Sequence, residues 1–168
     1  FDGMRNSPYL ESSPANPLNV YGRSKLDAER RVLEAMPAAL VVRTSAFFGP
    51  WDVHNFVTLA LRALATSTPF PAAEDATVSP TYVPDLVEAA LDLLIVWHLA
   101  NVGAVTWAGL ARRAAELVGL PEWLVEGKST AELGLPAKRP PYSVLESERG
   151  RVMPSLDDAL GRYLCEGQ

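Results

Sequence analysis

Cysteine is nearly absent from this chain of 168 residues, whose single thiol belongs to Cys165. One cysteine cannot form an internal disulfide, so the sequence indicates a reducing compartment, and we expect the cytoplasm. Cys165 also has no adjacent base in the sequence, which argues against a nucleophilic thiol. No uninterrupted apolar run reaches about 18 residues, so the sequence predicts no membrane-spanning helix.

Positive charge is also scarce, because 15 Lys and Arg stand against 20 Asp and Glu, for a formal net charge of -5. No Lys/Arg cluster could neutralise a row of phosphates, so we expect no nucleic-acid partner. The two histidines, His54 and His98, lack the spacing of a zinc site, and we expect no metal. His98 lies in an apolar segment and is expected to be a hydrogen-bonded core residue.

The chain does contain enough apolar residues for a folded core. It is 48% hydrophobic and 21% charged, which is the composition of a globular domain and excludes a disordered tail. A chain near this length buries roughly 70% of its unfolded surface. The sequence opens on Phe1 without an initiator methionine or a targeting pattern, so we expect a piece of a longer protein.

The apolar pattern predicts helices and strands in an α/β arrangement. Helices are expected over residues 20–36, 52–65, 84–94 and 107–118, and from Ser155 onward. Strands are expected over 38–42 and 95–100, a loop with one short strand over 66–79, and a Pro-rich loop over 138–142. The run 38–42 is apolar without alternation, which is typical of a parallel strand buried on both faces. No turn residue separates 84–94 from 95–100, so either the helix ends early or a connecting loop is missing.

Tyr21 and Lys25 lie four residues apart in the first expected helix, so both side chains project from one face. An ammonium beside a phenol favours the phenolate, which makes a tyrosine a workable proton donor or acceptor. The alternative is an ordinary exposed pair, since this spacing arises by chance in roughly one such chain in ten.

Several segments resemble the extended short-chain dehydrogenases/reductases. Residues 17–29, Pro-Leu-Asn-Val-Tyr-Gly-Arg-Ser-Lys-Leu-Asp-Ala-Glu, resemble the active-site helix of that family. Other segments resemble the family in the same order: 42–50, 55–56, 79–86 and 97–107. Residues 1–11 and the segment Arg139-Pro-Pro-Tyr-Ser-Val-Leu145 are similar to the dTDP-4-dehydrorhamnose reductase branch.

The sequence also departs from this family. The Gly-x-x-Gly-x-x-Gly turn, whose backbone N–H groups hold the cofactor pyrophosphate, is absent, as is the family's catalytic Ser or Thr. The resemblance therefore implies the C-terminal part of a Rossmann-like doubly wound parallel sheet plus a small mixed α/β substrate-binding lobe. Residues 1–50 and about 77–100 would belong to the nucleotide-binding fold, and about 51–76 and 101–168 to the lobe. The missing N-terminal half would be a partner, without which we expect no activity.

The resemblance implies an activity for the complete protein and roles for four residues. NADPH, or NADH, would reduce C4 of a 4-keto-6-deoxy sugar nucleotide. Tyr21 would protonate the C4 oxygen, and Lys25 would hold the nicotinamide ribose. Thr44 and Ser45 follow the predicted strand, at the edge where ligands approach an open α/β sheet, and would lie near the nicotinamide.

Four further residues are candidate substrate contacts, and each has a structural alternative. Phe47 would wall the sugar pocket or belong to the core. Asn55 would contact the sugar nucleotide or cap a helix. Thr81 would line the same cleft or cap the helix that begins near residue 84. Arg139 would clamp a diphosphate, because a guanidinium meets two phosphate oxygens at once, or be a solvated surface residue.

Two other functions stay open at this point. One is a non-catalytic sugar-nucleotide-binding or regulatory module, and the other is a sugar-nucleotide epimerase or dehydratase. An upstream Gly-rich turn and Ser/Thr would favour an enzyme over a regulatory module. A homodimer through the helix that bears Tyr21 is also compatible with the family.

Overall fold

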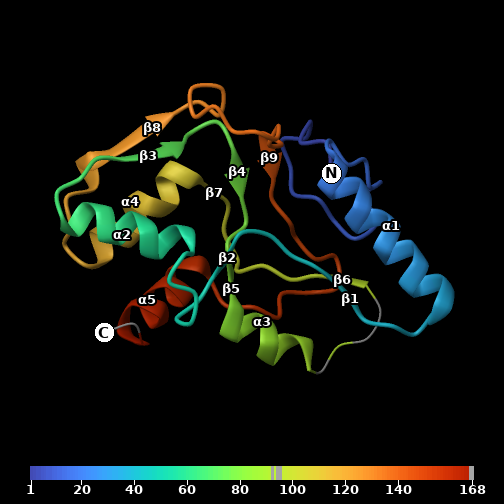
Figure 1. Cartoon of the computed structure of the whole chain (residues 1–168). Coiled ribbons are helices and arrows are strands. Elements are labelled where there is room, and N and C mark those ends of the chain that lie inside the picture. Colours follow the sequence, from blue (N-terminus) through green and yellow to red (C-terminus); the bar gives the residue numbers. More distant parts are fainter. Residues whose placement is uncertain (92, 94–95, 167–168) are drawn as a thin grey trace.

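The computed structural model describes residues 1–91, 93 and 96–166, and it contains helices and short strands (Figure 1). The helices are α1 (Val20–Ala35), α2 (Phe56–Ala65), α3 (Val83–Ala90), α4 (Trp107–Leu117), the 3-10 helix η1 (Glu122–Leu124) and α5 (Leu156–Glu166). The strands are β1 (Val41–Arg43), β2 (Phe47–Phe48), β3 (Phe70–Ala73), β4 (Thr77–Val78), β5 (Thr81–Tyr82), β6 (Val96–His98), β7 (Val105–Thr106), β8 (Val125–Lys128) and β9 (Tyr142–Ser143).

Most of the strand pairs are parallel, as the α/β prediction requires. Strand β1 pairs with β6, with Val41 opposite Val96 and Arg43 opposite His98. Strands β2 and β5 are also parallel, as are β3 and β8. In the remaining sheet, β4 lies between antiparallel β7 and parallel β9. The expected α/β fold with parallel strands is therefore confirmed.

Side-chain caps explain where several helices begin. The side chains of Asn19, Asn55 and Thr106 each accept a backbone hydrogen bond from the first turn of α1, α2 and α4, respectively. The Ser155 hydroxyl likewise accepts from the Asp158 N–H at 3.2 Å in α5. The predicted starts of α1, α4 and α5 are confirmed.

Other predicted boundaries need correction. Helix α2 begins at Phe56 and not near 52, because Asp52 closes a turn by accepting from the His54 N–H at 2.8 Å. The segment 66–79 contains two strands, β3 and β4, in place of one. Helix α3 ends at Ala90. The expected end of that helix at 94 and the question of a loop before β6 concern residues 92 and 94–95, which lie outside the described residues.

The core consists of two apolar clusters on either side of α4. The first includes Phe48, Tyr82 and Leu160, and the second includes Ala60 and Ala111. Ala60 on α2 and the alanines of α4 are fully buried, and their small side chains let the two helices approach closely. Figure 1 shows these helices beneath the β3–β8 pair.

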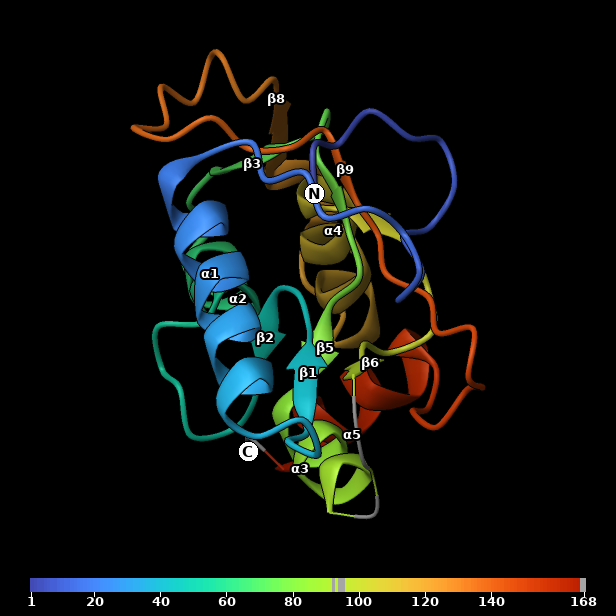
Figure 2. The ribbon, with the colours of Figure 1, turned by 90° about the vertical axis from the view of Figure 1, so that its right-hand side faces the viewer.

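Strand β1 is half-buried, so the expectation of burial on both faces was wrong. Its one strand neighbour among the described residues is β6, and α1 lies beside it (Figure 2). Helix α1 itself has no buried residue. The apolar run 38–42 correctly indicated a parallel strand, but the strand begins at Val41 and ends at Arg43, and the described part of the chain leaves it half-buried.

Candidate active site

The first turn of α1 is built by Asn19 and the residues that flank it. The Asn19 Oδ1 atom accepts a hydrogen bond from the Gly22 N–H at 2.8 Å and so caps the helix. A Cβ added at Gly22 would lie 2.8 Å from the Pro17 Cβ, so only glycine fits here without a shift. These contacts fix the position at which the helix starts, and Tyr21 is its second residue.

Tyr21 and Lys25 meet on the surface of α1, as their spacing predicted. The Lys25 Nζ atom lies 5.5 Å from the centre of the Tyr21 ring, within the range of a cation–π contact. Tyr21 is 69% exposed, and Lys25 is exposed as well. Lys25 forms no ion pair with any described residue. Its ammonium donors are therefore available to a ligand.

An ion pair joins the same face of α1 to the end of β1. Glu29 follows Lys25 by four residues, and Arg43 is the last residue of β1. Arg43 donates to both Glu29 carboxylate oxygens, from Nε at 2.9 Å and from Nη2 at 2.6 Å. This two-point contact fixes the helix that carries Tyr21 and Lys25 against the strand. Sequence reasoning missed it.

His98 supports Arg43 from the neighbouring strand. The His98 Nδ1 atom lies 2.9 Å from the Tyr9 carbonyl oxygen, which only accepts hydrogen bonds, so Nδ1 carries the proton. The Nε2 atom can then accept from Arg43 Nη1 at 3.3 Å. Burial lowers the pKa of His98 and keeps its ring neutral. The prediction of a hydrogen-bonded core histidine is confirmed.

Two predicted site residues meet where β1 and β5 come together. Thr44 directly follows β1, and its hydroxyl donates to the Thr81 hydroxyl at 3.0 Å. Thr81 is fully buried at the start of β5, whereas Ser45, next to Thr44, is half-buried. Thr81 does not cap α3, because the N-cap position belongs to Tyr82.

Phe47 faces the surface, and its neighbour Phe48 faces the core. Phe47 is 54% exposed and Phe48 only 2%, as expected for successive residues of a strand. Phe47 and Trp51 help to line a hollow, together with Phe48, Gly49, Asp52 and Val83. The core alternative for Phe47 is thus excluded, and its contact with a sugar stays a prediction.

Asn55 is buried, and its side chain is used within the protein. Its Oδ1 atom accepts from the Thr58 N–H at 3.0 Å, so Asn55 caps α2. Its Nδ2 atom donates to the Gly49 carbonyl oxygen at 3.2 Å and to the Tyr163 hydroxyl at 3.3 Å. The capping alternative therefore applies, and a contact between Asn55 and a sugar nucleotide stays a prediction.

Arg139 is exposed on the loop before β9. Its guanidinium has no hydrogen bond or ion pair with any residue for which the structure gives a position. The loop around it, in contrast, is held at two points. The Lys138 carbonyl oxygen accepts a hydrogen bond from Asn19 Nδ2, and the Pro141 carbonyl oxygen accepts one from the Thr77 N–H in β4.

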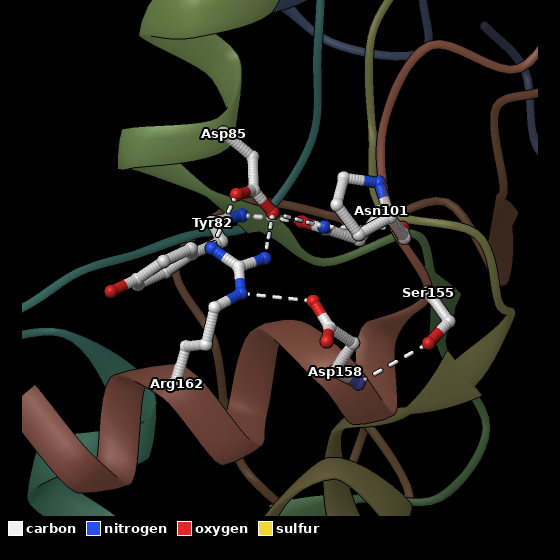
Figure 3. A network of polar contacts seen from close by, with 7 residues as sticks. Tyr82, Asp85, Asn101, Ser155, Asp158 and Arg162 are labelled. Atoms are coloured by element: carbon white, nitrogen blue, oxygen red, sulfur yellow. Dashed lines mark hydrogen bonds and ion pairs between the residues drawn. The ribbon is translucent and has the colours of Figure 1, made fainter.

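A second network that sequence reasoning missed lies at the junction of α3 and α5 (Figure 3). Asp85, which is 6% exposed, receives hydrogen bonds from Arg162 Nη1 at 2.6 Å and Nη2 at 2.8 Å. Asn101 Nδ2 donates to the same carboxylate at 2.8 Å, and Asn101 Oδ1 accepts from the Tyr82 N–H at 2.7 Å. The Asp85 carboxylate raises the pKa of Arg162. The network therefore fixes β5 relative to both helices.

No group of three or more His, Cys, Asp or Glu side chains is placed to hold a metal ion within 1–91, 93 and 96–166. No helix within these ranges is long and apolar enough to cross a membrane.

Parallel strand pairs with a Tyr-x-x-x-Lys helix beside them define a Rossmann-like protein of the short-chain dehydrogenase/reductase class. Within that class, the chain belongs to the RmlD substrate binding domain family, which matches residues 1–156. A dTDP-4-dehydrorhamnose reductase of Mycobacterium tuberculosis is 38% identical over 155 residues, which are 89% of this chain and 51% of that protein. The Mycolicibacterium smegmatis enzyme of the same name is 36% identical over 86% of this chain and 46% of its own length.

Solved structures agree with this assignment. A dTDP-4-dehydrorhamnose reductase from Bacillus anthracis, in complex with NADP, has a TM-score of 0.87 and 29% identity. It covers 100% of this chain, which spans 62% of that structure. A dTDP-glucose 4,6-dehydratase from the same organism, at 15% identity and a TM-score of 0.79, shows likeness of fold alone. The chain thus spans about half the length of the curated relatives that it matches.

Proposed function

We propose that the complete protein reduces the C4 carbonyl of a 4-keto-6-deoxy sugar nucleotide, of the dTDP-4-dehydrorhamnose type, with NADPH. The observation that carries this proposal is the exposed pair on α1, in which the Lys25 ammonium lies 5.5 Å from the centre of the Tyr21 ring. A lysine beside a tyrosine equips the phenol for proton transfer. The similarity to reductases over 89% of this chain supports the same reaction.

The residues present fit a nicotinamide cofactor. The Lys25 ammonium is exposed and has no carboxylate partner among the described residues, so its donors suit the hydroxyl groups of a ribose. Thr44 follows β1 at its carboxyl end, which is the edge where open α/β sheets bind nucleotides. When bound, the cofactor would supply the hydride that reduces the carbonyl.

The chain's own residues would handle the proton and the substrate. Tyr21 would donate its phenol proton to the C4 oxygen as that oxygen gains negative charge, and Lys25 would stabilise the phenolate that results. Phe47 would provide an apolar wall for the sugar, and Arg139 would bind the diphosphate. Thr81 would hold the Thr44 hydroxyl in place, because its own side chain is buried and accepts a hydrogen bond from that hydroxyl.

Residues 1–50 and about 77–100 would complete a nucleotide-binding fold with an N-terminal half that carries the Gly-rich turn. The pairs β1–β6 and β2–β5, which lie within these two ranges, support this division. The 168 residues alone would not turn over substrate, since they contain no Gly-x-x-Gly-x-x-Gly sequence. We place the complete enzyme in the cytoplasm, in agreement with the single thiol.

The test is the oxidation of NADPH by the complete protein in the presence of a dTDP-4-keto-6-deoxy sugar, with the product identified by NMR. We expect turnover, and we expect Tyr21→Phe to lower kcat by about a hundredfold or more. Tyr142→Phe, a change of the same kind in β9, is the control. Binding of the sugar nucleotide without turnover would identify a regulatory module instead, and isomerisation without net NADPH oxidation would identify an epimerase.

A further inference from the structure

One side chain joins α1 to the Pro-rich loop 138–141. Besides capping α1 through Oδ1, Asn19 donates a hydrogen bond from Nδ2 to the Lys138 carbonyl oxygen at 3.2 Å. A primary amide suits this double role because it offers an acceptor and two donors at the end of one side chain. Figure 2 shows the loop, in orange, passing beside the N-terminal end of α1.

The other end of the loop is held independently. The Pro141 carbonyl oxygen accepts from the Thr77 N–H at 2.8 Å. Gly3, with a φ of +76°, packs so closely that an added Cβ would lie 2.7 Å from both the Pro140 Cβ and the Pro141 Cδ. The proline rings restrict the backbone further. Arg139 therefore lies between Lys138, which Asn19 holds, and the two prolines, which Gly3 and Thr77 contact.

The side chain of Arg139 is available to a ligand. It is exposed and unpaired within the described part of the chain, although a guanidinium can make two parallel hydrogen bonds to a phosphate group. Tyr21 lies two residues after Asn19 along the chain. The two hydrogen bonds of Asn19 therefore fix the 138–141 loop, which carries Arg139, relative to the first turn of α1, which carries Tyr21.

We propose that Asn19 is a positioning residue, which holds the 138–141 loop on the first turn of α1 so that Arg139 and Tyr21 engage one sugar nucleotide together. This role rests on the proposed function and names a residue that determines the affinity for its substrate.

Two substitutions separate the loop contact from the helix cap. Asn19→Asp and Asn19→Ser both keep an oxygen that can cap α1, but they remove the amide that donates to Lys138. Asn19→Ala removes both functions. Asn6→Asp is the control for the added charge, because Asn6 is exposed and its side chain forms no bond with any described residue.

The first readout is the rate at which trypsin cleaves the complete protein after Lys138, followed by mass spectrometry. Loss of one hydrogen bond loosens the loop, so we expect Asn19→Asp and Asn19→Ser to accelerate this cleavage by about fivefold. Asn6→Asp should leave the rate unchanged. With dTDP as the probe, the wild-type protein should be protected at Lys138 more strongly than Asn19→Ser.

The second readout is the steady-state kinetics of the complete enzyme. Asn19→Ser should raise the KM for the sugar nucleotide by about fivefold, with kcat changed by less than about twofold and the KM for NADPH unchanged. In an Arg139→Ala background the same substitution should have no further effect on KM, because the residue that it positions is gone.

Cleavage after Lys138 and a KM that both stay at wild-type values in Asn19→Ser would overturn the proposal. A fall in kcat confined to Asn19→Ala, with cleavage and KM at wild-type values in Asn19→Ser, would also overturn it and leave Asn19 as a helix cap. If the wild-type protein lacks reductase activity, the proposed function fails. The cleavage rates with and without dTDP then still decide whether Asn19 holds the loop for a nucleotide.

Discussion

Arg43 donates hydrogen bonds to both carboxylate oxygens of Glu29, from Nε at 2.9 Å and from Nη2 at 2.6 Å, and so connects the last residue of β1 to the helix of the candidate active site. The Arg43 side chain is 20% exposed and that of Glu29 is 15% exposed. Water therefore competes only weakly for either partner. The same guanidinium contacts His98, so one cation connects α1, β1 and β6.

We predict that Glu29→Gln destabilises the chain by about 2 kcal/mol, because it leaves a mostly buried guanidinium without its charge partner. The measurement is the free energy of unfolding in urea. Asp27→Asn is the matched control on the same helix, since Asp27 lies 3.9 Å from Arg30 in a pair whose side chains are both 65% exposed. That control should change the free energy by no more than about 0.5 kcal/mol. Equal effects of the two substitutions would contradict this view of Arg43.

Asp85→Asn should be a second strongly destabilising change, with a cost of about 3 kcal/mol. It weakens the double contact with Arg162 and presents an amide to the Asn101 donor. Thermal unfolding followed by circular dichroism measures the effect. The control is Asp157→Asn in α5, which removes the charge from an exposed ion-pair partner of Arg113 in α4. A melting temperature that Asp85→Asn leaves unchanged would show that the network is dispensable.

Stability should also fall in acid because of Glu11. Burial by itself would raise the pKa of this carboxyl, but hydrogen bonds from the Ser147 hydroxyl and the N–H groups of His98 and Glu148 outweigh burial and lower the pKa to about 2. The folded-state pKa thus lies below the unfolded-state value, so the folded form binds fewer protons. This contribution is complete above about pH 5 and is lost as the pH falls toward 2.

The free energy of unfolding measured between pH 6 and about pH 3 tests this prediction. Glu11→Gln should flatten the dependence on pH in that range, because glutamine does not titrate. Glu116→Gln, an exposed change in α4, should preserve the slope. If Glu11→Gln has the slope of the wild-type chain, Glu11 does not contribute to acid sensitivity.

Lys25→Met should weaken cofactor binding by the complete enzyme. It removes the ammonium proposed to hold the ribose, and a hydrogen bond from a charged donor corresponds to about tenfold or more in affinity. The dissociation constant of NADPH, measured by fluorescence, should rise accordingly. Lys128→Met, in β8, is the control, because Lys128 pairs with Glu126 at 3.1 Å. An unchanged dissociation constant would remove Lys25 from the cofactor site.

Local signals predicted the parts of the fold and site that depend on residues near one another. The Tyr21–Lys25 pair follows from helical spacing, and the caps at Thr106 and Ser155 follow from residue type. The parallel strand β1 follows from its apolar run, and its approximate position could be predicted without the rest of the sheet.

Contacts between distant residues could not be predicted in this way. Asp85 and Arg162 are 77 positions apart, and Asn55 and Tyr163 are 108 apart. A single sequence carries no periodicity over such separations. The contact of Asn55 with Tyr163 and the ion pairs of Arg43 and Arg162 therefore required the three-dimensional arrangement.

The partial enclosure of β1 also has a consequence for its backbone. A strand with a single neighbour in the described residues has one edge whose N–H and C=O groups lack a ladder partner there. Such an edge is a template to which another strand can add. Strand β1 therefore holds the Tyr21 helix through Arg43, and its unpaired edge is a place where the parallel sheet can grow by one more strand.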